Sequence, residues 1–174
     1  QATGYAGDPN LEGKTPNLDR LAKESVNLVN AVSTMPVCTP YRASLLTGQY
    51  ALSHGLFMND AQLNPELTTI AKVFKAAGYD TGYVGKWHID GHGRSAYIPE
   101  ERRQGFDYWK VLECTHTYNA SAYYAGNDPV KKQWKGYDAI AQTRDVQRYI
   151  SDHAHGSRPF VAFLSWESPH NPYQ

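Results

Sequence analysis

The sequence predicts an α/β fold in which helices flank a mostly parallel sheet. The first observation is that amphipathic helical patterns alternate with short apolar runs typical of buried strands. The second is that polar clusters at 85–88 and 167–170 directly follow two of those runs. In open α/β sheets, sites gather in the loops beyond the carboxyl ends of the strands. The pattern therefore predicts an architecture and also the edge of the sheet at which a site forms.

The expected helices carry ordinary start and stop signals. Thr15 can cap the first helix, and Pro16 takes its first position, where a missing N–H costs nothing. Gly78 supplies the stop of a later helix. The segments with helical patterns are 14–21, 39–46, 67–77 and 138–153.

Three segments are expected to be strands. These are 26–32, which alternates apolar and polar residues, 79–84, and 159–166, which is the strongest candidate for a buried strand. The stretch 91–135 is rich in Gly, Tyr, Asn, Pro and charge, and we expect long loops with little regular structure there. A structureless stretch of that length usually carries function or is an insertion.

Composition narrows the classes of function. The 174 residues are enough for one domain with a substantial core, and 17 basic residues balance 17 acidic ones without blocks of like charge. We therefore expect no nucleic-acid partner. The apolar runs are far shorter than the roughly 18 residues that span a bilayer, so no membrane span is expected. Cys38 and Cys114 could pair, but they make no disulfide framework and their spacing fits no zinc motif.

The strongest chemical signal lies in residues 37–48, VCTPYRASLLTG. If 39–46 is a helix, Cys38 lies at its N-terminus, where backbone N–H groups favour an anion. Arg42 follows one turn later on the same side, and its guanidinium suits the oxygens of sulfate or phosphate. The residue types alone allow two interpretations: a nucleophile precursor in an oxyanion pocket, or a packed cysteine beside an arginine in an ordinary ion pair.

A fuller pattern favours the first interpretation. Cys-x-Pro-x-Arg, followed by four residues and Thr-Gly, resembles the signature of the type I sulfatases. The five positions are Cys38, Pro40, Arg42, Thr47 and Gly48. Further segments resemble parts of the same family in the same order: Gly4-Tyr5 followed by KTPNLDRLAKES, Gly85-Lys86-Trp87-His88, ERRQGFDYW at 101–109, and Ser-Pro-His-Asn-Pro-Tyr at 168–173. The resemblance spans essentially the whole chain.

The resemblance implies an alkaline-phosphatase-like fold and a formylglycine-dependent sulfatase. In that family a maturation enzyme oxidises the motif cysteine, here Cys38, to formylglycine, which is the nucleophile. The resemblance implies that Arg42 steadies the formylglycine hydroxyls and that Lys86 bridges the sulfate oxygens and the hydrated aldehyde. It implies that His88 takes the proton whose loss releases sulfate. His170 would contact the sulfate or protonate the leaving oxygen.

The resemblance also implies calcium, or another divalent cation, held by oxygen ligands. Within this chain only Cys38, as formylglycine, would be a ligand, because the family's paired aspartates precede Gly4 and its other ligands follow position 174. Residues 1–174 would then be an interior piece of a catalytic domain with a loop-rich insertion at about 91–135. We expect this piece alone to be inactive and to bind metal weakly.

Several functions remain open at this stage. The leading one is hydrolysis of a sulfated carbohydrate, and a sulfated small molecule such as an aryl or steroid sulfate is the alternative substrate. The aromatic stretch 97–134 could form a wall for sugar rings, although those aromatics could equally pack a loop onto the core. His92 and His116 are further candidates for substrate contact. The alternatives are a phosphonate or phosphate monoester hydrolase of the same superfamily and a binding module that has lost catalysis. Export to the periplasm or the medium is expected for an enzyme that meets sulfated polysaccharides.

Overall fold

The computed structural model describes residue 10 and residues 13–172. Gly4-Tyr5 and Tyr173, which belong to two of the motifs above, lie outside the described residues. The chain divides into two compact units, residues 1–33 and residues 34–174, and each is considered by itself. No helix in the described part of the chain combines the length and apolar character needed to cross a membrane.

The described part of the first unit contains helix α1 (Pro16–Lys23), which begins with proline as the sequence predicts. The expected capping bond is not formed by the Thr15 side chain. Its hydroxyl instead donates to the Asp19 carboxylate at 2.8 Å. The start of the helix is therefore fixed by a contact between side chains one turn apart.

The strand expected over 26–32 does not form in the described structure. Val26, Val29 and Val32 are 87%, 80% and 84% exposed, and no described strand pairs with them. A strand without a neighbour leaves its backbone donors and acceptors without ladder partners, so apolar alternation alone cannot hold it. The prediction was wrong because the pattern reports suitable side chains but not the presence of a sheet beside them.

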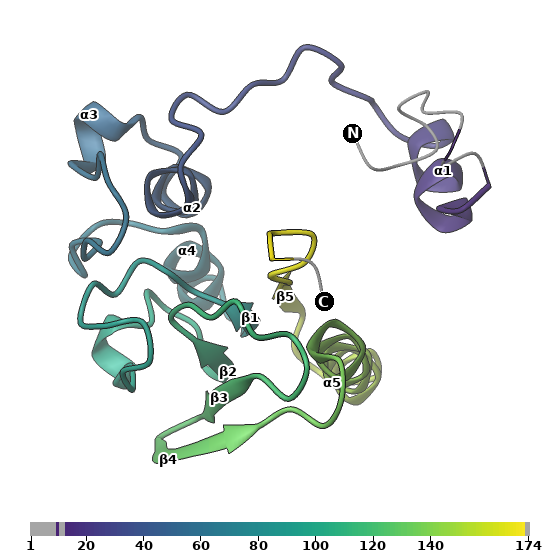
Figure 1. Ribbon diagram of the computed structural model, residues 1–174. Coiled ribbons are helices and arrows are strands. Elements are labelled where there is room, and N and C mark those ends of the chain that lie inside the picture. The colour runs from purple at the N-terminus through teal and green to yellow at the C-terminus, as the bar shows by residue number, and fades with distance from the viewer. Residues whose placement is uncertain (1–9, 11–12, 173–174) are drawn as a thin grey trace. The chain divides into compact units, whose positions relative to one another are not determined.

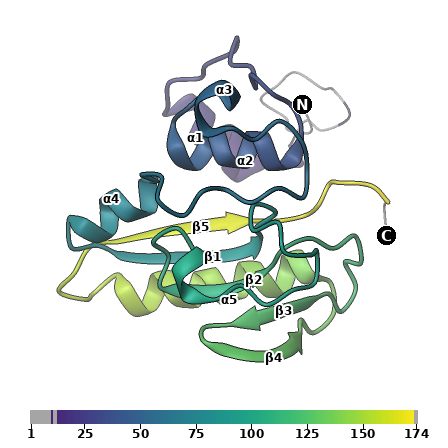
Figure 2. The same ribbon diagram turned by 90° about the vertical axis from the view of Figure 1, so that its left-hand side faces the viewer.

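The second unit is built on a mixed five-stranded sheet with the order β4-β3-β2-β1-β5 (Figures 1 and 2). Strand β1 (Asp80–Lys86) lies between β2 (Tyr108–Leu112) and β5 (Phe160–Ser165) and is parallel to both. Strands β3 (Ala122–Ala125) and β4 (Asp128–Gln133) extend the sheet as an antiparallel hairpin. The predicted α/β class is confirmed, and the antiparallel hairpin makes the sheet mixed.

Helices cover both faces of this sheet (Figure 2). On one face, Tyr83 of β1 belongs to a buried cluster with residues of α2 (Cys38–Thr47) and α4 (Ile70–Ala76). On the other face, its neighbour Val84 packs with residues of α5 (Asp138–His153). Successive strand residues point to opposite faces, so β1 is buried on both sides. The described residues also form two short helices, α3 (Ala51–His54) and the 3₁₀ helix η2 (Glu100–Arg102).

The stretch 91–135 contains more regular structure than the sequence predicts, since β2, β3 and β4 all lie within it. The expectation of little regular structure was therefore wrong for these segments. Gly126-Asn127 joins β3 to β4, and a Gly-Asn pair between two runs is a known hairpin signal. The tyrosines that suggested a loop wall also favour strands, because aromatic side chains pack well on a pleated surface.

Candidate active site

Two side chains from the first half of α2 tie this helix to the end of β1. Arg42 Nη1 donates to the main-chain carbonyl of Lys86 at 2.9 Å, and Thr39 Oγ1 donates to that of His88 at 2.6 Å. Cys38, the first residue of α2, is partly exposed and forms no disulfide. These contacts bring the predicted residues of both segments to the carboxyl ends of the parallel strands.

Arg42 is held by hydrogen bonds rather than by an ion pair. Besides the Lys86 carbonyl, its Nη1 donates to Ser165 Oγ at 2.7 Å and to Tyr83 Oη at 3.3 Å. No carboxylate in the described residues lies within ion-pair distance of the guanidinium. The ordinary ion pair considered above is therefore not formed here, and the positive charge is not neutralised by a contacting acid.

His88 follows β1 in a left-handed backbone conformation, with φ of 59°, and its side chain is buried. Its Nε2 lies 3.0 Å from Asp60 Oδ1, whereas Nδ1 is buried and has no hydrogen-bond partner in the structure. Arg94 also contacts Asp60, through Nε at 3.0 Å and Nη2 at 2.8 Å. Hydrogen bonds from Arg94 first, and then from His88, lower the Asp60 pKa to about 2.

The tautomer of His88 follows from this contact. An ionised carboxylate can only accept, so Nε2 carries the proton and Nδ1 is the nitrogen with a lone pair. Burial lowers the pKa of His88, although the bond to Asp60 opposes that shift. The imidazole is therefore neutral at neutral pH, and its basic nitrogen is the one without a protein partner.

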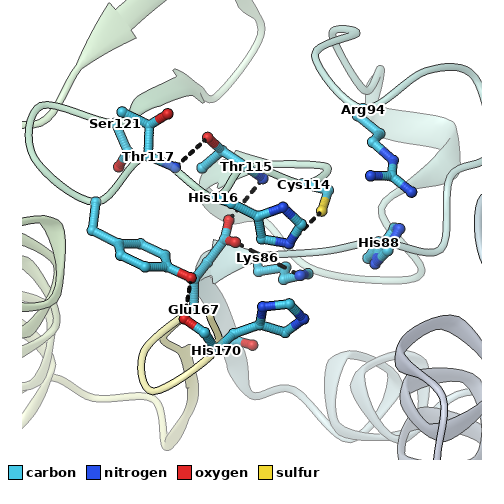
Figure 3. A network of polar contacts seen from close by, with 12 residues as sticks. Lys86, His88, Arg94, Cys114, Thr115, His116, Thr117, Ser121, Glu167 and His170 are labelled. Atoms are coloured by element: carbon cyan, nitrogen blue, oxygen red, sulfur yellow. Dashed lines mark hydrogen bonds and ion pairs between the residues drawn. The ribbon is translucent and has the colours of Figure 1, made fainter. Parts of the chain in front are cut away.

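Lys86 and His170 meet a second cluster of polar side chains, shown in Figure 3. Lys86 is 3% exposed, and its Nζ lies 3.6 Å from Glu167 Oε2. Glu167 Oε1 accepts from the Thr115 backbone N–H at 3.0 Å. The ring of His170 stacks on that of His116, with 4.5 Å between centroids. The structure thus brings His116 to the site.

Sequence analysis missed several of these neighbours. Glu167 was predicted only as a member of the polar cluster at 167–170, with no role of its own. Asp60 and Arg94 lie in separate loops with no motif around them, and Cys114 was considered only as a disulfide or zinc-motif partner. His92 was a candidate for substrate contact; its Nδ1 lies 2.7 Å from the Asp90 carbonyl oxygen and its side chain is 46% exposed, so the candidate stays a prediction.

The described residues do not complete the calcium site that the resemblance implies, as expected if only Cys38 is a ligand within this chain. Their one group of three potential ligands is Cys114, His116 and Glu167, whose donor atoms lie within 4.8 Å of one another. Cys38 is not part of that group, and calcium takes oxygen donors rather than a thiol or an imidazole. Cys38, as formylglycine, is still the one ligand that the sequence assigns to calcium in this chain.

A helix N-terminus, an arginine, a lysine and a histidine come together near the carboxyl ends of the parallel strands. This arrangement defines a class of α/β domains with a polar site at that edge of the sheet. The chain belongs to the sulfatase family. The family model described as Sulfatase matches residues 2–174, which is nearly the whole chain.

Known relatives support the same assignment. An ulvan-active sulfatase of Formosa agariphila is 55% identical over 172 residues, which cover 99% of this chain and 33% of that protein. A solved structure from the metabolism of multiple glycosaminoglycans by Bacteroides thetaiotaomicron has a TM-score of 0.84 at 29% identity, covering 99% of this chain and 40% of its own. A structure in complex with its substrate D-glucosamine-2-N,6-O-disulfate has a TM-score of 0.74 at 28% identity, with coverages of 91% and 30%. The chain spans about a third of the length of the curated relatives it matches.

Proposed function

We propose that this chain forms part of a sulfuric ester hydrolase that acts on a sulfated carbohydrate through a formylglycine made from Cys38. The observation that carries the proposal is the pair of bonds from Arg42 and Thr39 to the carbonyls of Lys86 and His88. These bonds support the proposal because they join the segment of the expected nucleophile to the segment that carries the expected lysine and base. The relative named for ulvan and the structure bound to a sulfated glucosamine support a carbohydrate substrate.

The proposed reaction needs an aldehyde at position 38, which a formylglycine-generating maturation enzyme supplies. The aldehyde adds water and becomes a geminal diol. The oxygen of one hydroxyl attacks the sulfur, the bond from sulfur to the alcohol oxygen breaks, and the proton given up by the attacking hydroxyl balances the one taken up by the leaving alcohol. The second hydroxyl then loses its proton, the carbonyl re-forms, and the bond from carbon to the sulfate oxygen breaks. Covalent catalysis of this kind includes its own release step, which a sulfated thiol would lack.

The side chains suit these steps as follows. His88 Nδ1 has the lone pair that takes the proton of the second hydroxyl, and Asp60 keeps the ring in that tautomer. Lys86 contacts the sulfate oxygens, and Arg42 holds the diol oxygens. His170, which is exposed, contacts the sulfate or protonates the leaving alcohol oxygen. Fixed cations at a partly closed site stabilise the negative charge that develops during transfer.

Calcium or another divalent cation belongs to the proposal only through the resemblance. Such an ion supplies positive charge to bound oxygens when it is present. Because the described residues do not complete a set of oxygen ligands, no step above is assigned to it. Export to the periplasm or the medium accompanies a polysaccharide substrate and is part of the same proposal.

The first test is the mass of the tryptic peptide that contains Cys38. The protein is produced at its full natural length together with a maturation enzyme, with Cys38→Ala as the control. We expect a peptide lighter by the difference between a thiomethyl group and an aldehyde, which a hydrazine traps. An unmodified thiol would contradict the nucleophile assignment and favour the non-catalytic binding module.

The second test separates the two enzyme classes. Rates are compared on an aryl sulfate and an aryl phosphate with the same leaving group. A higher kcat/KM for the sulfate supports the proposal. A higher value for the phosphate, or for a matched phosphonate ester, would assign the chain to the phosphonate and phosphate monoester hydrolases.

A further inference from the structure

Cys114, His116 and Glu167 form a cluster that the proposed reaction does not use. Cys114 follows β2, and Glu167 follows β5. Their donor atoms and one from His116 all lie within 4.8 Å of one another, and Cys114 Sγ is 4.0 Å from His116 Nε2. Cys114 is 4% and Glu167 6% exposed, whereas His116 is partly exposed. Figure 3 shows the three side chains around Lys86.

One donor atom of the cluster lacks a hydrogen bond. Glu167 Oε2 is buried and accepts no hydrogen bond, whereas Oε1 is occupied by the Thr115 N–H. The nearest cation to Oε2 is Lys86 Nζ, which at 3.6 Å is beyond hydrogen-bond distance. A buried carboxylate oxygen without a bond is costly unless a charge or a metal ion compensates it. Lys86 compensates it only through the longer ion pair.

The three donors are a thiol, an imidazole and a carboxylate, which together suit a borderline-soft divalent cation. In a tetrahedral zinc site the sulfur and nitrogen ligands lie about 3.5 Å apart, so the 4.0 Å separation needs only a small movement. Burial, and then Lys86, lower the pKa of His116, which leaves the imidazole neutral. Burial raises the pKa of the Cys114 thiol, so binding must release that proton to solvent.

We propose that Cys114, His116 and Glu167 bind a zinc-like divalent cation, in competition with the Lys86 ammonium for the same carboxylate. Thiolate and carboxylate together neutralise the two charges of the ion, and solvent takes the fourth position. The cation and the ammonium repel each other, so the ion binds well only when the Lys86 side chain moves away from Glu167. If Lys86 contacts sulfate, as the proposed function states, the bound cation inhibits hydrolysis.

The test is a titration of the untagged protein at its full natural length with Zn²⁺ and with Co²⁺, in a buffer that contains calcium. Isothermal titration gives the zinc affinity, and absorbance reports a charge-transfer band from a thiolate to cobalt. Cys114→Ser should abolish that band, and Cys114→Ser or Glu167→Gln should each weaken zinc binding by about tenfold or more. Lys86→Met should strengthen zinc binding, because it removes the competing charge.

Two variants serve as controls. Cys38→Ala removes the other cysteine, and His92→Asn removes a histidine bonded to Asp90, so both should keep the zinc affinity and the cobalt band. Far-ultraviolet circular dichroism checks that every variant folds. A cobalt band that survives in Cys114→Ser, or no zinc binding by the parent protein, would overturn the site. Unchanged affinity in Lys86→Met would overturn the competition.

Activity is measured separately from binding. Zinc that binds through the cluster and slows hydrolysis of an aryl sulfate supports both the site and the role of Lys86. Zinc that binds without slowing hydrolysis supports the metal site and contradicts the role of Lys86 in the proposed function. The zinc site and the proposed role of Lys86 in hydrolysis are therefore contradicted by different results.

Discussion

His88 Nε2 lies 3.0 Å from Asp60 Oδ1, and this contact leaves Nδ1 as the basic nitrogen of the ring. Asp60 is itself held by Arg94, which contacts both carboxylate oxygens. The chain thus fixes the orientation of a buried imidazole with a carboxylate from a separate loop. Such a carboxylate selects the tautomer without having to exchange the proton itself.

Removal of the Asp60 carboxylate should change both the rate and its pH dependence. The bond to Asp60 raises the pKa of His88 against the effect of burial, so Asp60→Ala lowers that pKa further. The acid limb of kcat/KM for an aryl sulfate should move to lower pH, and the maximal rate should fall by about 10²-fold or more. Arg94→Met, which keeps the carboxylate, should cause a smaller loss. An acid limb at the same pH in Asp60→Ala would contradict the role of His88.

Arg42→Lys tests whether the shape of the guanidinium matters beyond its charge. Lysine keeps the charge but cannot reproduce the bonds from Nη1 to Lys86, Ser165 and Tyr83. We expect kcat/KM to fall by about 10²-fold and the free energy of unfolding to fall by about 1–3 kcal/mol. Ser165→Ala removes one acceptor only and should cost about 1 kcal/mol. Equal rates for Arg42→Lys and the parent protein would rule out this positioning role.

Glu113 should make stability depend on pH. Its carboxylate is 2% exposed, and burial raises its pKa to about 7, although the N–H groups of Gly91 and Asp90 oppose the shift. The folded chain keeps the proton up to that pH, whereas the unfolded chain releases it near the ordinary 4.5. The free energy of unfolding therefore decreases as the pH rises between these values, by about 3 kcal/mol at most.

Glu113→Gln measures that contribution, because an amide does not titrate. Chemical denaturation at pH 5 and pH 8 should show that the variant gains stability relative to the parent protein at the higher pH, by up to about 3 kcal/mol. The exposed Glu101→Gln is the control and should show no such difference. If the difference in the free energy of unfolding between the variant and the parent protein is the same at pH 5 and at pH 8, the raised pKa is contradicted.

Gly85 allows β1 and β5 to approach closely beside the site. A Cβ at this position would lie 2.2 Å from the Ser165 carbonyl oxygen, and its φ of +108° is unfavourable for any other residue. Gly85→Ala should lower the free energy of unfolding by about 3 kcal/mol. Gly126, with φ of +51° and open space around it, is the matched control, and Gly126→Ala should cost about 1–2 kcal/mol. Similar losses for the two variants would show that close packing at Gly85 is unimportant.

The 174-residue chain by itself should bind calcium weakly. The one potential ligand group in the described residues contains a thiol and an imidazole, which calcium does not favour. Calorimetric titration of the isolated chain should give no tight, stoichiometric binding, whereas the protein at its full natural length should bind. Tight binding by the isolated chain would mean that it holds a complete set of oxygen ligands.

The sequence by itself determined those helices and strands that are specified by periodicity, capping residues and apolar runs. Helix periodicity located α5 at 138–153, and apolar runs located β1 and β5 to within a residue or two. The Cys-x-Pro-x-Arg pattern predicted the candidate site, because Cys38 and Arg42 are close in sequence and lie about one turn apart on the same helix. Alternation at 26–32 failed as a strand signal, because a strand depends on a partner that no local pattern can report.

Only the tertiary structure decided which distant residues meet. Parallel pairing places Gly85 opposite Ser165, so β1 and β5 end together and Lys86 comes near Glu167. The contact between Asp60 and His88 likewise joins a loop to the end of a strand, 28 residues apart. Periodicity and capping act over a few residues, whereas strand register and loop packing depend on the whole fold. The cysteine motif could therefore be recognised from local sequence, whereas its neighbours from other segments could be identified only from the fold.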